Sequence, residues 1–165
     1  LHQTRYQLPI PPSPNLPNMK SIYLYPSTCF FEATPVSLGR GTSLPFQVYG
    51  HPNMTGYNYS FTPRSIPGAK NPPQLNKLCH GVDLSNMSDE EIWKRGVDLT
   101  YVIDAYRNLN LDDHFFRPFF ELLVGRDYVR KMIKEGKSAD DIKAMWKGDV
   151  EKFKAQRKPY LLYEE

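Results

Sequence analysis

Acidic side chains are almost missing from the first half of this 165-residue chain, where Glu32 is the one carboxylate between Leu1 and Val82. Residues 1–80 carry six Lys and Arg, whereas residues 81–165 carry fifteen Lys and Arg and seventeen Asp and Glu. The net charge of +3 is small and the basic residues of the first half are dispersed, so nothing indicates a nucleic-acid partner. A weakly basic half with a single carboxylate instead favours a small anionic or polyhydroxylated ligand.

Cysteine and long apolar runs are scarce as well. Cys29 and Cys79 are too few and too far apart for a metal motif or a disulfide framework. We expect two buried thiols, with a single disulfide as the alternative if the protein is exported. No apolar run approaches the ~20 residues that span a bilayer, and His51, His80 and His114 are scattered. The sequence therefore predicts no membrane span, no metal site and no cofactor.

The composition changes near residue 85, since thirteen of the fifteen prolines precede it and the long amphipathic patterns follow it. We interpret the chain as α+β, with a β-strand and loop-rich N-terminal half packed with a helical C-terminal half. Residues 1–20 form a Pro-rich arm that must be extended, because proline disfavours helix, and residues 21–165 form a single domain. The PxxP pattern of the arm leaves open a role as a protein-interaction ligand.

Periodicity locates the expected elements. Strands are expected over residues 21–25, 29–31, 46–49, 57–62, 78–84 and 160–163. Capping residues at Ser88 and Ser138 predict helices that run to about Asn108 and Gln156, and Gly136 ends a third helix over 127–135. The segment 115–123 is expected to be partly helical.

The sharpest local feature is the sequence Gly39-Arg40-Gly41-Thr42. Glycines on both sides permit positive φ angles and a close approach of ligand to backbone, and successive N–H groups there can form an anion-binding nest. Arg40 adds a planar fork suited to a carboxylate. The alternative is a tight turn whose arginine pairs with Glu32. The pattern is neither a P-loop nor a dinucleotide fingerprint.

Glu32 has three candidate roles: general acid, acceptor for ligand hydroxyls, or ion-pair partner of Arg40. The usual glycoside hydrolysis needs two carboxyl groups, ~5–5.5 Å apart for retention or ~6.5–9.5 Å for inversion. A second carboxylate would have to come from Asp83, from the helical half or from another domain. Aromatic residues at strand spacing favour a core role over sugar stacking; these are Tyr49, Tyr57, Tyr59 and Phe61.

A run of motifs in order resembles one bacterial family. The motifs are Pro12-Ser13-Pro14-Asn15-Leu16-Pro17, Tyr25-Pro26-Ser27-Thr28-Cys29-Phe30-Phe31-Glu32-Ala33-Thr34, Ser37-Leu38-Gly39-Arg40-Gly41-Thr42, Pro45-Phe46-Gln47, Phe61-Thr62-Pro63, Cys79-His80-Gly81-Val82 and Tyr160-Leu161-Leu162-Tyr163. Together they resemble the C-terminal domain of the exo-β-N-acetylmuramidases, long catalogued as a domain of unknown function. The resemblance covers nearly the whole chain. One departure is alanine at position 33, where the family has glycine.

The resemblance implies a Rossmann-like N-terminal domain ahead of this one, with the active site in the cleft between them. It also implies release of N-acetylmuramic acid from the non-reducing ends of peptidoglycan, with the catalytic glutamate on the preceding domain. This chain alone is then expected to be inactive or nearly so. A peptidoglycan substrate implies a periplasmic or secreted protein, although no signal peptide is visible.

The expected substrate and the residues of the first half fit each other. N-acetylmuramic acid carries a lactyl carboxylate, for which Arg40 and the N–H groups of Gly39 and Gly41 are suitable donors. The expected contacts to the sugar hydroxyls or the N-acetyl group come from Asn15, Glu32, Thr34, Ser37 and Thr42. Two alternatives stay open: a non-catalytic carbohydrate- or peptidoglycan-binding module, and a protein-interaction domain.

Overall fold

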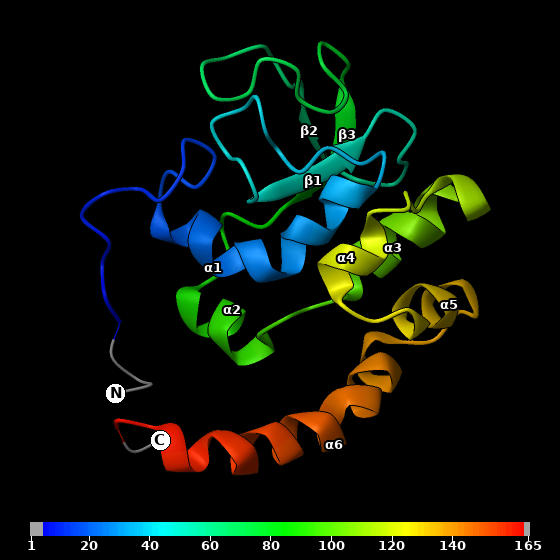
Figure 1. Cartoon of the computed structure of the whole chain (residues 1–165). Helices are drawn as coiled ribbons and strands as arrows, with labels where there is room; N and C mark the ends of the chain where they lie inside the picture. The colour runs from blue at the N-terminus through cyan, green and yellow to red at the C-terminus, as the bar shows by residue number, and fades with distance from the viewer. Residues whose placement is uncertain (1–4, 164–165) are drawn as a thin grey trace.

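The computed structural model describes residues 5–163, so residues 1–4 of the expected arm and residues 164–165 of the expected domain lie outside it. In chain order the elements, with η for a 3₁₀ helix, are α1 (Met19–Thr28), η1 (Cys29–Ala33), β1 (Val48–His51), β2 (Tyr59–Phe61), β3 (Cys79–Asp83), α2 (Asp89–Arg95), α3 (Thr100–Leu109), η2 (Asp112–His114), α4 (Phe120–Val124), α5 (Tyr128–Lys134), α6 (Ala139–Arg157) and η3 (Lys158–Tyr160). The fold is α+β, as predicted. Figure 1 shows the sheet at one end of the molecule and α6 at the other.

The sheet has three antiparallel strands in the order β1-β3-β2. These strands confirm the expected segments 46–49, 57–62 and 78–84, and both ends of each strand lie within two residues of the expected ends. Gly81 in the central strand faces Gly50 of β1, and a Cβ atom at Gly81 would lie 1.9 Å from the Tyr49 carbonyl oxygen. Glycine is therefore required where the two backbones approach each other.

The predicted strands over residues 21–25 and 29–31 are wrong, because these residues form α1 and η1. Asn18 caps α1 through a reciprocal capping box with Ser21, which satisfies backbone donors that a strand would not expose. Ser21, Leu24 and Thr28 are buried at helical spacing, whereas Pro26 lies on the exposed side and removes only one helix hydrogen bond. Cap chemistry and burial therefore outweigh the β-branched and aromatic composition.

Two further expectations are corrected in the helical half. The helix predicted from Ser88 to Asn108 is two helices, since Gly96 adopts a φ of 60° at the end of α2. Asp98 accepts a hydrogen bond from the Thr100 N–H at 2.9 Å and starts α3. The strand predicted over 160–163 does not form, because residues 158–160 continue from α6 as η3. The helices expected over 127–135 and from Ser138 are confirmed as α5 and α6.

The main core joins η1, β1 and the helices. The Phe31 ring is stacked on Tyr49 with ring centroids 4.8 Å apart, and both are buried. The hydroxyls of Tyr49 and Tyr57 both donate to Asp104 Oδ2 at 2.8 Å, which ties β1 and the β1–β2 loop to α3. Of the four aromatic residues predicted to be structural, Tyr49 and Phe61 are buried, and Tyr57 and Tyr59 are partly buried against the core. None of the helices between residues 5 and 163 combines the length and hydropathy of a membrane span.

Candidate functional site

Glu32 is held at the surface by a rigid segment. Its neighbour Phe31 is fully buried, and the Arg117 N–H donates to the Ala33 carbonyl oxygen at 2.9 Å. Ala33 is itself fully buried and has no positive φ, so alanine fits where the family has glycine. The Glu32 side chain, 28% exposed, therefore projects from a backbone that the core fixes.

The Gly39–Gly41 turn has the conformation that its glycines predict. Both glycines have a φ of 83°. A Cβ at Gly41 would lie 2.5 Å from the Arg64 carbonyl oxygen, and the Arg64 N–H donates to the Gly41 oxygen at 2.8 Å. The turn is thus clamped between the core and the loop over residues 63–76, which positions Arg40 beside Glu32.

Three hydroxyls that were expected to contact a ligand form hydrogen bonds within this segment. Thr34 Oγ1 donates to the Phe31 carbonyl oxygen, and Thr42 Oγ1 donates to the Gly39 carbonyl oxygen. Ser37 is fully buried, and its Oγ accepts from the Gly39 N–H at 3.4 Å. Such side-chain-to-backbone bonds fix turns. The ligand contacts expected of these residues stay predictions, whereas their hydrogen bonds give them a role in holding the turn.

Arg40 and Glu32 form a loose ion pair. Arg40 Nη1 lies 3.6 Å from Glu32 Oε1, beyond the 2.7–2.9 Å of a charge-assisted hydrogen bond. Within residues 5–163 this is the only polar contact of the Arg40 side chain, and its Nε atom is buried without a partner. In the same range, the backbone N–H groups of Arg40 and Gly41 donate none of the described hydrogen bonds. The turn therefore keeps unused donors beside a carboxylate.

Burial dominates the electrostatics of this surface. It raises the pKa of the Glu32 carboxyl above the usual value, and the Arg40 charge opposes that shift.

Burial, assisted by the Glu32 charge, raises the pKa of the Cys29 thiol to about 11. Cys29 and Cys79 are both free, and burial raises the pKa of Cys79 to about 11 as well. The prediction of a buried thiol is confirmed for Cys79, whereas Cys29 is only partly buried. Neither is a thiolate at neutral pH.

Glu32→Gln is expected to leave the free energy of unfolding at pH 7 unchanged or slightly higher, by under about 1 kcal/mol for a partly exposed group. Because the folded-state pKa is raised, the stability that the protonated carboxyl contributes is present at low pH and is lost as the pH rises through that pKa. Urea unfolding of both proteins at about pH 4 and pH 7 measures the difference. A wild type that gains stability over the variant as the pH rises would contradict this reading of Glu32.

Tyr25 is a candidate site residue that the sequence reasoning missed. With 25–28 in a helix and 29–33 in a 3₁₀ helix, Tyr25, Cys29 and Glu32 recur at i, i+4 and i+7. Burial is the main cause of the raised pKa of both Tyr25 and Cys29, and the Glu32 charge adds to it. Tyr25 is 38% exposed, and its ring centroid lies 5.0 Å from that of Phe46. The i, i+4, i+7 spacing would have revealed it had the segment been predicted as helix.

Phe46 beneath Tyr25 has a φ of 61°, which is costly for a bulky side chain. Two hydrogen bonds hold this conformation. The Phe46 N–H donates to the Leu38 carbonyl oxygen at 2.7 Å, and the Thr28 hydroxyl donates to the Phe46 carbonyl oxygen at 3.2 Å. Backbone strain of this kind clusters at binding sites. The strained φ angle of Phe46 therefore favours the 38–46 loop as part of a binding site.

The remaining candidates are Asn15 and the histidines from the sequence, and the cavities of the surface. Asn15 Nδ2 donates to the Gly68 carbonyl oxygen at 3.0 Å, on the same 63–76 loop that covers Gly41. His51 and His80 are opposite each other on β1 and β3. Among residues 5–163 no group of three or more His, Cys, Asp or Glu side chains is placed to hold a metal ion. A hollow of about 720 Å³ lies at the end of α6 rather than beside Glu32.

Comparison with known proteins agrees with the fold and the motifs. Residues 23–163 match the family described as exo-beta-N-acetylmuramidase NamZ, C-terminal. The chain is also similar to the peptidoglycan beta-N-acetylmuramidase NamZ of Bacillus subtilis strain 168, with 33% identity over 167 residues that cover 92% of this chain and 40% of that protein. The resemblance predicted from the sequence is thereby confirmed.

Two solved structures from Bacteroides fragilis NCTC 9343 are similar to this chain, and both are DUF1343 family proteins. One is 82% identical, with a TM-score of 0.97, covering 99% of this chain and 46% of that chain. The other is 21% identical, with a TM-score of 0.64 over 94% of this chain and 45% of that chain, and so shares the fold. This chain spans less than half the length of each relative, and it belongs to the family of NamZ C-terminal domains.

Proposed function

We propose that this chain supplies the substrate-binding wall of a peptidoglycan exo-β-N-acetylmuramidase that releases N-acetylmuramic acid from non-reducing ends. The observation that carries the proposal is the Arg40 guanidinium, which has unused donors and lies 3.6 Å from Glu32 on a clamped turn. Arg40, with the Arg40 and Gly41 N–H groups, binds the lactyl carboxylate of the sugar. This group distinguishes muramic acid from glucosamine.

Glu32 and Tyr25 contact the rest of the sugar in this proposal. The Glu32 carboxylate accepts hydrogen bonds from sugar hydroxyls, and the Tyr25 ring, backed by Phe46, lies against the pyranose. Asn15 contributes from the arm. Thr34, Ser37 and Thr42 act mainly through the shape of the turn, as their bonds to the backbone indicate.

The site needs a second carboxylate, and we assign it to another part of the protein. Glu32 is the one carboxylate of the first half of the chain, and hydrolysis by the usual route takes two. The relatives of this C-terminal domain are more than twice its length, which leaves room for a preceding domain. Residues 1–20 then lead from that domain, and the active site is the cleft between the two. The peptidoglycan substrate implies a periplasmic or secreted location.

The test joins this chain behind the preceding part of the 82% identical Bacteroides fragilis relative. The joined protein is expected to hydrolyse 4-nitrophenyl β-N-acetylmuramic acid, and this chain alone is expected to have no activity above background. Equal activity of the chain alone would contradict the shared site. A joined protein that binds the sugar without hydrolysing it would favour a non-catalytic peptidoglycan-binding module.

A further inference from the structure

Helix α6 continues beyond the core that its first half packs against. Ala139 and Ile142 are buried, and Trp146 lines an apolar cavity of about 280 Å³ together with Phe30 of η1 and Val129 of α5. From residue 147 to residue 163, every side chain except Arg157 is exposed. We call residues 147–163 the α6 overhang. About half of the helix thus lies outside the domain that anchors it.

The apolar stripe of α6 does not stop where the core stops. Ile142, Trp146, Val150 and Phe153 recur at intervals of four, four and three residues, which places them along one face. Phe153 is 59% exposed. A helix exposed to water on all sides does not need such a stripe, so its continuation indicates a surface that is covered in the assembled protein.

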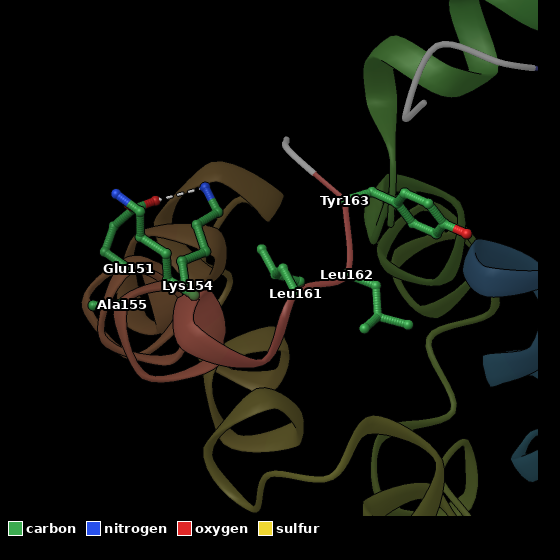
Figure 2. Close-up of a pocket in the computed structure, with 7 residues that line it drawn as sticks. Glu151, Lys154, Ala155, Leu161, Leu162 and Tyr163 are labelled. Carbon is green, nitrogen blue, oxygen red and sulfur yellow. Dashed lines mark hydrogen bonds and ion pairs between the residues drawn. The ribbon is translucent and has the colours of Figure 1, made fainter.

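The tail borders a second face of the α6 overhang, turned by more than about 90° around the helix axis from the apolar stripe. Leu161 lies over the end of α6, and Glu151, Lys154 and Ala155 of the helix line a hollow of about 720 Å³ together with the tail. Figure 2 shows Leu162 and Tyr163 pointing away from the helix, and Leu162 is 90% exposed. The tail supplies the large apolar side chains of this hollow, whereas the helix side supplies mainly charged ones.

We propose that the α6 overhang is the docking surface for the part of the longer family proteins that precedes this domain. The inference rests on the two-part protein of the proposed function and adds the surface by which the parts are joined. The family is a C-terminal one, and the chain covers 46% of the Bacteroides fragilis relative, so a segment longer than this chain is available to cover the surface.

The described part of the arm lies against α2, which also contacts α6. Arg5 lies over the Trp93 ring at 5.2 Å and pairs with Glu90 at 2.7 Å, so the arm is fixed to α2. Lys143 Nζ of α6 donates to the Arg95 carbonyl oxygen at the end of α2 at 3.0 Å. Helix α2 therefore contacts both Arg5 of the arm and Lys143 of α6, so the described start of the arm and α6 lie on the same side of the domain.

The charges of the overhang favour a different partner over a second copy. Over residues 147–163 lysine and arginine outnumber the acidic residues, with Lys147, Lys152, Lys154 and Arg157 of α6 and Lys158 of η3 against Asp149 and Glu151. Both acidic residues already pair within this chain, with Arg126 and Lys154 respectively. A symmetric dimer would bring two basic surfaces together, whereas a partner with an apolar centre and an acidic rim complements them.

Amide hydrogen exchange of residues 150–163 tests the docking. We expect exchange at least tenfold slower in the joined protein than in this chain alone. Phe153→Asp and Leu162→Asp in the joined protein should restore the fast exchange of the isolated chain. Leu122→Asp is the matched control, because Leu122 on α4 is 77% exposed and lies outside the overhang, and it should leave the protection intact.

Identical exchange in the joined and isolated proteins overturns the proposal, and so does an equal effect of Leu122→Asp. Sedimentation of this chain alone provides the second measurement. A dimer that Phe153→Asp dissociates would assign the overhang to a second copy and overturn the proposal as well. Because hydrolysis is measured separately, an active joined protein with an unprotected overhang would remove the docking surface and leave the proposed function standing.

Discussion

Arg40→Ala in the joined protein is expected to raise KM for a muramic-acid substrate about ten- to a hundredfold. The range corresponds to loss of a hydrogen bond to a charged group, about 1.5–3 kcal/mol. Arg40 has one loose ion pair and a buried Nε without a partner, so its removal costs little inside the folded protein. Steady-state kinetics and a thermal melt of the same variant separate binding from stability.

Two controls sharpen this result. Arg64→Ala removes an exposed arginine of the neighbouring loop, whose Nη1 donates to Asn76 Oδ1, and should leave KM unchanged. Arg40→Lys keeps the charge and loses the planar fork, so its KM should lie between those of the wild type and Arg40→Ala. An unchanged KM for Arg40→Ala would remove Arg40 from the binding site.

Gly41→Ala is expected to lower the free energy of unfolding by about 2–4 kcal/mol, at the upper end of single substitutions. Two costs add. The φ of 83° costs a residue with a Cβ about 1–2 kcal/mol, and the new Cβ would lie 2.5 Å from the Arg64 carbonyl oxygen, a backbone atom that cannot turn away. Chemical denaturation of the two proteins measures the sum.

Gly56→Ala isolates the first cost. Gly56 has the same φ of 83°, and a Cβ there meets nothing within 4 Å, so this variant should lose only about 1–2 kcal/mol. The difference between the two losses in unfolding free energy is the cost of pushing the 63–76 loop away from the turn. If both variants lose the same amount, the loop does not clamp the turn and Arg40 is not positioned by it.

Features with a local cause were predictable from the sequence. Ser138 caps α6 through its own side chain, and glycine at 39 and 41 is required by positive φ, so both were expected correctly. Of the three strands, the segment 57–62 was predicted from its strict alternation of aromatic and polar residues. Residues 21–25 were mispredicted because aromatic and β-branched residues favour strand, whereas Asn18 and the burial of one helical face decide the outcome in the folded chain.

The candidate site was predictable only where its features have a local cause in the sequence. Its charged residues were visible from their isolation in the sequence, and the ion pair between Glu32 and Arg40 was one of the stated alternatives. Tyr25 and the strained Phe46 were not visible, since their positions depend on a helix that was predicted as strand and on a tertiary contact between rings. The use of the Thr34 and Thr42 hydroxyls by the backbone likewise requires three-dimensional knowledge.

Recognition of the lactyl carboxylate by this surface can be measured by amide NMR of this chain during titration with sugars. N-acetylmuramic acid should shift the resonances of Glu32, Gly39, Arg40 and Gly41, and N-acetylglucosamine, which lacks the lactyl group, should shift them at least tenfold less at equal concentration. Arg40→Ala should abolish the difference between the two sugars. Equal shifts with both sugars, or shifts confined to other residues, would show that this surface does not recognise the lactyl carboxylate.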